Sequence, residues 1–85
     1  MTADLAQLRA ALPLQWRPHP YSPRCWYADH HGVRYIAKRF TPARFDLDVG
    51  KPARGCDVCH GGAWSWGRAP AEAVARWRAQ MEVAP

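Results

Sequence analysis

The run Cys56-Asp57-Val58-Cys59-His60 is the most specific chemical pattern in the chain. Two cysteines separated by two residues can hold their thiolates about one coordination edge apart, which is half of a tetrahedral zinc site. The same spacing followed by histidine is the attachment pattern of c-type haem, and a Cys-x-x-Cys pair also serves thiol redox chemistry. Cys56, Cys59 and His60 are therefore the candidate metal ligands, with zinc as the candidate cofactor.

Each chemistry at this run lacks something that it needs. Covalent haem attachment normally follows export, and the N-terminus carries Asp4 and no basic region of a secretory signal. A redox pair needs a helix after the first cysteine, whereas Gly61-Gly62 follows here. Two loop cysteines without a metal remain an open alternative to zinc. The further zinc ligands would come from other segments or from the run itself: His19, Cys25, His30, His31 or His60.

Catalytic constellations are missing from the sequence. The only serines are Ser22 and Ser65, and neither lies in a nucleophile motif. The pattern from Asp46 to Gly50 resembles the start of a calcium loop, but Lys51 stands where that loop requires glycine. We therefore predict that the protein is not an enzyme.

The charge balance points instead to binding. The chain has 12 basic and 7 acidic residues, a net charge of +5, and ten of the basic residues are arginine. Arginine binds carboxylates and phosphates bidentately and stacks on aromatic rings. Arginine beside exposed aromatic rings is typical of protein hot spots and of single-stranded nucleic-acid binding. The candidate binding residues, which interleave with aromatic residues, are Arg34, Lys38, Arg68, Arg76 and Arg78.

The 85 residues are enough for one small domain, residues 1–85, whose core depends on aromatic residues because large aliphatic residues are few. We expect Trp64, Trp66 and Trp77 to belong to that core. Leucines at helical spacing predict a helix from Thr2 to Leu12. Two strands, Cys25–His30 and Val33–Phe40, flank His31-Gly32 and predict a hairpin.

The second half of the chain predicts two more strands and a helix. The alternating segment Phe45–Val49 predicts a strand whose two aspartates lie on a wet face, and Trp64-Ser65-Trp66 predicts a short strand. Pro70 suits the first position of a closing helix. The result is an α+β fold, α-β-β-β-(β)-α, in which N- and C-terminal helices flank an antiparallel sheet of three to four strands. Its predicted core joins the hairpin to the closing helix through Trp26, Tyr35, Val74 and Trp77.

A loose sequence pattern runs from about residue 14 to residue 82. It comprises Leu14-x-Trp16, Trp26-Tyr27-Ala28-Asp29 and Gly32-Val33-x-Tyr35-x-Ala37, followed by tryptophan ahead of an Ala-rich helix. This pattern resembles small uncharacterised proteins of phages and prophages. The resemblance implies an accessory or inhibitor module, anti-CRISPR proteins among them, that occupies a surface on a host complex. The Cys56–His60 run departs from the pattern, and the resemblance assigns no residue a role.

The sequence thus predicts a non-enzymatic binding protein that inhibits or modulates a host protein or nucleoprotein complex. A zinc-stabilised nucleic-acid-binding domain is the alternative. We expect a cytoplasmic location, because three cysteines do not suit a disulfide framework. We expect no membrane partner, because no segment approaches the roughly 18 apolar residues of a span.

Overall fold

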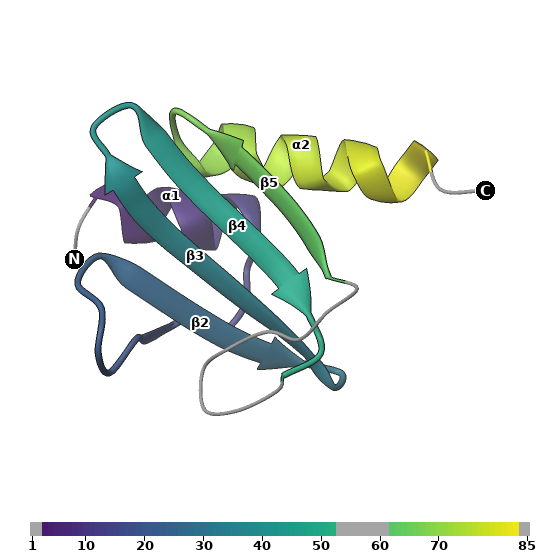
Figure 1. The fold of residues 1–85 in the computed structure, drawn as a ribbon, viewed down its shortest axis with the longest axis horizontal. Coiled ribbons are helices and arrows are strands. Elements are labelled where there is room, and N and C mark those ends of the chain that lie inside the picture. The colour runs from purple at the N-terminus through teal and green to yellow at the C-terminus, as the bar shows by residue number, and fades with distance from the viewer. Residues whose placement is uncertain (1–2, 53–61, 84–85) are drawn as a thin grey trace.

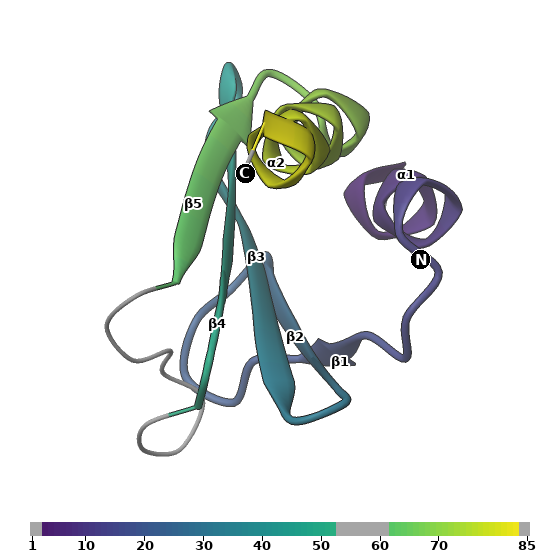
Figure 2. The same ribbon diagram turned by 90° about the vertical axis from the view of Figure 1, so that its right-hand side faces the viewer.

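Five strands pair in the order in which they occur in the chain and form one antiparallel sheet (Figure 1). The structure is a computed structural model that describes residues 3–52 and 62–83. The two helices lie on the same face of the sheet and contact each other, and no helix of the described residues covers the opposite face (Figure 2). The elements are α1 (Ala3–Ala11), β1 (Arg17–Pro18), β2 (Cys25–His30), β3 (Val33–Thr41), β4 (Arg44–Gly50), β5 (Ala63–Gly67) and α2 (Pro70–Val83).

The predicted α+β fold with its terminal helices is confirmed. The sheet has five strands, whereas three to four were predicted. The additional strand is the short β1, which pairs with the start of β2. The predicted hairpin is also confirmed, with strands β2 and β3. His31 and Gly32 both have positive φ, 52° and 76°, as a two-residue type I′ turn requires.

The core lies between the sheet and the two helices. Trp26 on β2 and Val74 on α2 are buried, as predicted. Tyr35 and Trp77 pack against this core as partly buried residues, and their ring centroids lie 5.7 Å apart in an edge-to-face arrangement. The predicted core between the hairpin and α2 is therefore confirmed. The other large buried side chains are Leu8, Leu12, Trp16, Phe45, Leu47 and Val49.

β5 and α2 lie so close together that no large side chain fits between them. Ser65 is buried, and its Oγ donates a hydrogen bond to the Ala73 carbonyl at 2.8 Å. A Cβ atom at Gly67 would lie 2.8 Å from the Ala73 backbone nitrogen, a distance that real Cβ atoms essentially never show. The helix-facing side of β5 must therefore carry small residues.

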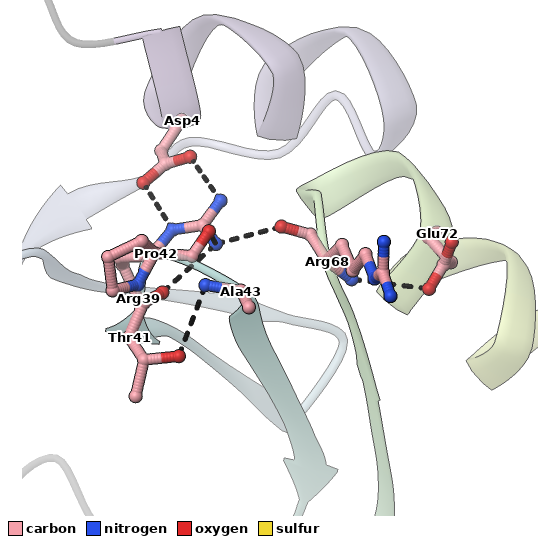
Figure 3. Close-up of polar contacts among 7 residues, drawn as sticks. All are labelled: Asp4, Arg39, Thr41, Pro42, Ala43, Arg68 and Glu72. Carbon is pink, nitrogen blue, oxygen red and sulfur yellow. Dashed lines mark hydrogen bonds and ion pairs between the residues drawn. The ribbon is translucent and has the colours of Figure 1, made fainter.

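Arg39 on β3 ties α1 to the loops at one end of the sheet (Figure 3). Its Nε and Nη2 donate to the two carboxylate oxygens of Asp4 at 3.0 and 2.8 Å. Its Nη1 donates to the carbonyls of Thr41, Pro42 and Arg68, the last at 2.8 Å. The hydrogen bonds to Asp4 raise the pKa of Arg39. One side chain thus joins the first helix, the β3–β4 turn and the β5–α2 connection.

Candidate interaction surface

Three large aromatic side chains are exposed near β5 and the β3–β4 turn. Trp64 and Trp66 keep 46% and 41% of their surface exposed, and Phe40 keeps 60%. The expected core position of Trp64 and Trp66 is therefore wrong. Side chains alternate along a strand, and the close approach of α2 leaves room only for Ala63, Ser65 and Gly67 on the helix side. The two tryptophans consequently lie on the helix-free face.

Cationic side chains lie over these rings. The Arg44 guanidinium is 5.4 Å from the ring centroids of both Trp64 and Trp66 and 5.8 Å from that of Phe40. Two further cations extend the arrangement at its ends. The guanidinium of Arg76 lies 4.9 Å from the Trp66 ring, and the Nζ atom of Lys38 lies 5.1 Å from the Phe40 ring. We call the set Lys38, Phe40, Arg44, Trp64, Trp66 and Arg76 the cation–aromatic patch.

Hydrogen bonds hold the two arginines of the patch over the rings. Arg44 Nε donates to Asp46 Oδ1 at 2.8 Å. Arg76 Nη1 donates to the Trp66 carbonyl at 3.0 Å, and its Nη2 lies 3.4 Å from Glu72 Oε1 one helical turn away. Both guanidinium groups therefore have defined positions before any partner binds, and less conformational entropy is lost on binding.

Carboxylates on the same face offset its positive charge. Asp46 is only 7% exposed, so the prediction that it lies on a solvent-exposed face of β4 is wrong. Arg44 pairs with it, and Lys38 and Trp66 flank it on the neighbouring strands. Asp48 is half-buried, and burial together with the negative charge of Asp46 raises its pKa. β2–β4 present three cations (Arg34, Lys38, Arg44) and three carboxylates (Asp29, Asp46, Asp48) on this face.

The five candidate binding residues do not lie together. Lys38 and Arg76 belong to the patch. Arg34 lies further along the same face, where it donates two hydrogen bonds to Asp29 at 2.6 and 2.8 Å and lowers the pKa of that carboxyl. Arg68 lies in the β5–α2 connection, and Arg78 donates to a carbonyl at the end of α1.

The sequence interpretation left four residues of the patch out of the candidate site: Phe40, Arg44, Trp64 and Trp66. One signal for the tryptophans was available. In the segment Ala63–Gly67 small residues alternate with tryptophan, and a strand packed closely on a helix must direct its small residues toward that helix. No comparable local signal exists for Arg44, because the rings that it contacts come from two other elements, β3 and β5.

The candidate zinc ligands Cys56, Cys59 and His60 lie outside the described residues. Within residues 3–52 and 62–83, no three His, Cys, Asp or Glu side chains converge as a metal site would require. Cys25 is buried in β2, and His30 and His31 lie at the hairpin turn. The zinc site therefore stays a prediction.

Comparison with protein-family models, with curated proteins and with solved structures found no match to this chain. Neither helix, within the part of the chain that the structure describes, is long and apolar enough to cross a membrane.

Proposed function

We propose that the chain is a non-enzymatic binding protein that docks on a host protein, free or within a nucleoprotein complex, through its cation–aromatic patch. Occupying that surface would inhibit or modulate the host protein by excluding its other ligands. The observation that carries the proposal is the exposed pair Trp64 and Trp66 with Arg44 held over both rings. We expect the encounter to take place in the cytoplasm.

The residue types of the patch favour a protein interface. Tryptophan and arginine are enriched among the few residues that carry most of the binding energy at protein interfaces. An exposed tryptophan adds a large contact area, and a stacked arginine adds directed hydrogen bonds. Because rings and hydrogen-bond partners already position these side chains, the cost of ordering them on binding is small.

The charge of the face favours a protein over a nucleic acid. Phosphate recognition relies on cations whose charge is free to replace counterions. Here Arg34, Arg44 and Arg76 are each paired with a carboxylate. A face whose arginines are paired in this way complements the mixed surface of a protein better than the uniform charge of a phosphate backbone.

A quantitative capture experiment tests this proposal. The tagged chain, a Trp64→Ala/Trp66→Ala variant and a Tyr21→Ala control are used as baits in host lysate, with and without nuclease. Tyr21 suits the control because it is 90% exposed and lies outside the patch. The captured protein is then purified, and its affinity for all three baits is measured at two salt concentrations.

We expect the double variant to melt as a folded protein and to lose at least about tenfold in affinity, or roughly 1.4 kcal/mol. The Tyr21→Ala control should bind as the unchanged chain does, and nuclease should have no effect. Native affinity of the double variant would refute the proposal. Nuclease-sensitive capture with a steep loss of affinity in salt would instead support the zinc-stabilised nucleic-acid-binding alternative.

A further inference from the structure

Asp48 differs from the other two carboxylates of the helix-free face. Asp29 holds Arg34, and Asp46 holds Arg44, each with a shortest N–O distance of 2.8 Å or less. Among the described residues, no side chain forms an ion pair or hydrogen bond with the Asp48 carboxylate. Asp48 is thus a half-buried acid without a counter-charge in the described part of the chain.

The cations nearest to Asp48 in the sheet are engaged elsewhere. Asp48 pairs across the strands with Ile36 on β3 and Trp64 on β5, so Arg34 and Lys38 are its diagonal neighbours. Arg34 binds Asp29, and the Lys38 ammonium lies over the Phe40 ring. The charged groups around Asp48 are therefore these two cations on β3, Asp46 on β4, and Arg44, which lies over the Trp64 ring and is bound to Asp46. The neighbours of Asp48 on β5 are uncharged.

The face repeats one arrangement twice. On β4 and β5, Asp46 pairs across the strands with Trp66, and Asp48 pairs in the same way with Trp64. The first aspartate–tryptophan pair is completed by Arg44, whose guanidinium both binds the carboxylate and stacks on the indole. At the second pair, Arg44 lies equally close to the indole, 5.4 Å from the Trp64 ring centroid, but its guanidinium is bound to Asp46. No described residue therefore supplies a cation that binds the Asp48 carboxylate.

We propose that Asp48 and Trp64 form a receptor for an arginine side chain of the partner protein. This inference rests on the proposed function, because the arginine belongs to the same docked partner. The incoming guanidinium pairs with the Asp48 carboxylate and packs against the part of the Trp64 indole that stays exposed beside Arg44. Planar shape and bidentate donors favour arginine over lysine at such a site.

The ionisation of Asp48 makes this site testable. Burial, together with the negative charge of Asp46, raises the pKa of the Asp48 carboxyl in the free protein. A bound guanidinium stabilises the charged form and lowers that pKa again. Arginine binding is therefore coupled to proton release. Affinity should fall as the pH drops through the pKa of Asp48 and should be constant well above it.

The first test uses a probe and needs no partner. Blocked arginine (N-acetyl-L-arginine amide) is titrated into the protein while the indole N–H signal of Trp64, assigned with Trp64→Phe, is followed by NMR. Blocked citrulline, which has the same shape without the charge, is the matched ligand. A saturable shift with arginine alone, absent in Asp48→Asn, is expected. Equal shifts with both ligands, or an undiminished arginine shift in Asp48→Asn, would overturn the proposal.

The second test uses the partner purified in the capture experiment. Asp48→Asn should weaken its binding at pH 7 about tenfold and abolish the pH dependence, while the free variant melts at a higher temperature than the unchanged chain. Glu82→Gln, which removes an exposed carboxylate from α2 on the other side of the sheet, is the control and should leave the affinity unchanged. If Asp48→Asn binds with native affinity and pH profile while Trp64→Ala/Trp66→Ala does not bind, the arginine receptor is wrong and the proposed function stands.

Discussion

Arg39 is the residue on which the attachment of α1 most depends. It is 11% exposed and makes five hydrogen bonds to groups from three parts of the chain. Lysine keeps the charge but cannot bind Asp4 bidentately while reaching the carbonyls. We predict that Arg39→Lys lowers the free energy of unfolding by about 2–3 kcal/mol. Urea denaturation measures this loss, with Arg24→Lys on an exposed arginine as the control.

A double-mutant cycle with Asp4→Asn measures how much of the effect of Arg39 comes from its ion pair with Asp4. This experiment uses Arg39→Met, which removes the charge. If the ion pair with Asp4 is the main term, the Arg39→Met/Asp4→Asn variant should be little less stable than Arg39→Met alone. A fully additive loss would show that Arg39 stabilises the chain chiefly through the carbonyls of Thr41, Pro42 and Arg68. A loss below about 0.5 kcal/mol for Arg39→Lys would contradict the prediction itself.

Asp48 should destabilise the free protein at neutral pH. Because its folded pKa is raised above the unfolded value, the folded chain binds this proton more tightly, so the penalty disappears as the pH falls through the folded pKa. We predict that Asp48→Asn melts at a higher temperature at pH 7 and that its advantage shrinks toward acidic pH. Melting curves across pH measure this difference, and an unchanged advantage at all pH values would contradict it.

Asp29 is the opposite case and serves as the comparison for Asp48. Its pKa is lowered, mainly by the hydrogen bonds from Arg34, so its contribution to stability is present above its usual pKa and is lost as the pH falls through the folded value. Asp29→Asn should therefore give no gain in melting temperature at pH 7. The two aspartates on one face thus predict pH effects of opposite sign.

At the scale of elements, the packing of α2 on β5 decides which side chains reach the helix-free face. The absent side chain of Gly67 is part of that packing, because a Cβ atom there would meet Glu72 Cβ at 2.7 Å and the Ala73 nitrogen at 2.8 Å. We predict that Gly67→Ala destabilises the protein by about 1–3 kcal/mol and shifts the amide signals at the start of α2. Thermal melting and NMR spectra measure the two effects, and a variant with neither would contradict this description.

Trp77 connects α2 to the hairpin. Its ring meets Tyr35 edge to face, and it packs against the buried core while part of its surface stays exposed. We predict that Trp77→Ala lowers the free energy of unfolding by about 3 kcal/mol, the lower end of the range for removal of a large aromatic residue. Such a loss should leave so small a domain barely folded. Trp77→Phe keeps a ring in place and should retain a cooperative transition. An unchanged midpoint for Trp77→Ala would show that α2 is held by other contacts.

Elements could be predicted from the sequence where local periodicity and turn chemistry decide the structure. His31-Gly32 fixed the hairpin and its register, Pro70 marked the start of α2, and Leu8 lies in the core at its helical spacing. The sequence interpretation went wrong on β5 because aromatic composition suggested a core position, whereas the close helix admits only small residues. The patch could not be predicted as a unit, since Arg44 meets Trp64 and Trp66 only through sheet pairing.

The helix-free face carries only part of the excess positive charge of the molecule. The net charge is +5, and β2–β4 contribute equal numbers of cations and carboxylates to that face, to which Arg17 of β1 and Arg76 of α2 add positive charge. Much of the excess therefore lies elsewhere, on residues such as Arg9, Arg24 and Arg68, which are exposed. General attraction to an acidic partner and specific docking can thus come from different parts of the surface, since distributed charge acts mainly on association rates.

Both edges of the sheet are protected against pairing with another strand. β1 has only two residues, and one is Pro18, which has no N–H to donate. On the outer edge of β5, the carbonyls of Trp64 and Trp66 accept hydrogen bonds from Gln80 and Arg76 of α2, at 2.8 and 3.0 Å. Unpaired edge groups promote association between sheets, so these side chains from α2 keep β5 from serving as a template.

We predict that Arg76→Ala/Gln80→Ala exposes this edge and makes the protein self-associate. The mass of the double variant, measured by light scattering, should rise with protein concentration, whereas that of the unchanged chain should stay at the 9.6 kDa of one chain. Arg24→Ala/Gln7→Ala is the matched control, because it removes the same two side-chain types from exposed positions away from β5. It should leave the mass constant. If the mass of the Arg76→Ala/Gln80→Ala variant also stays constant with concentration, the hydrogen bonds from α2 are not what protects the edge of β5.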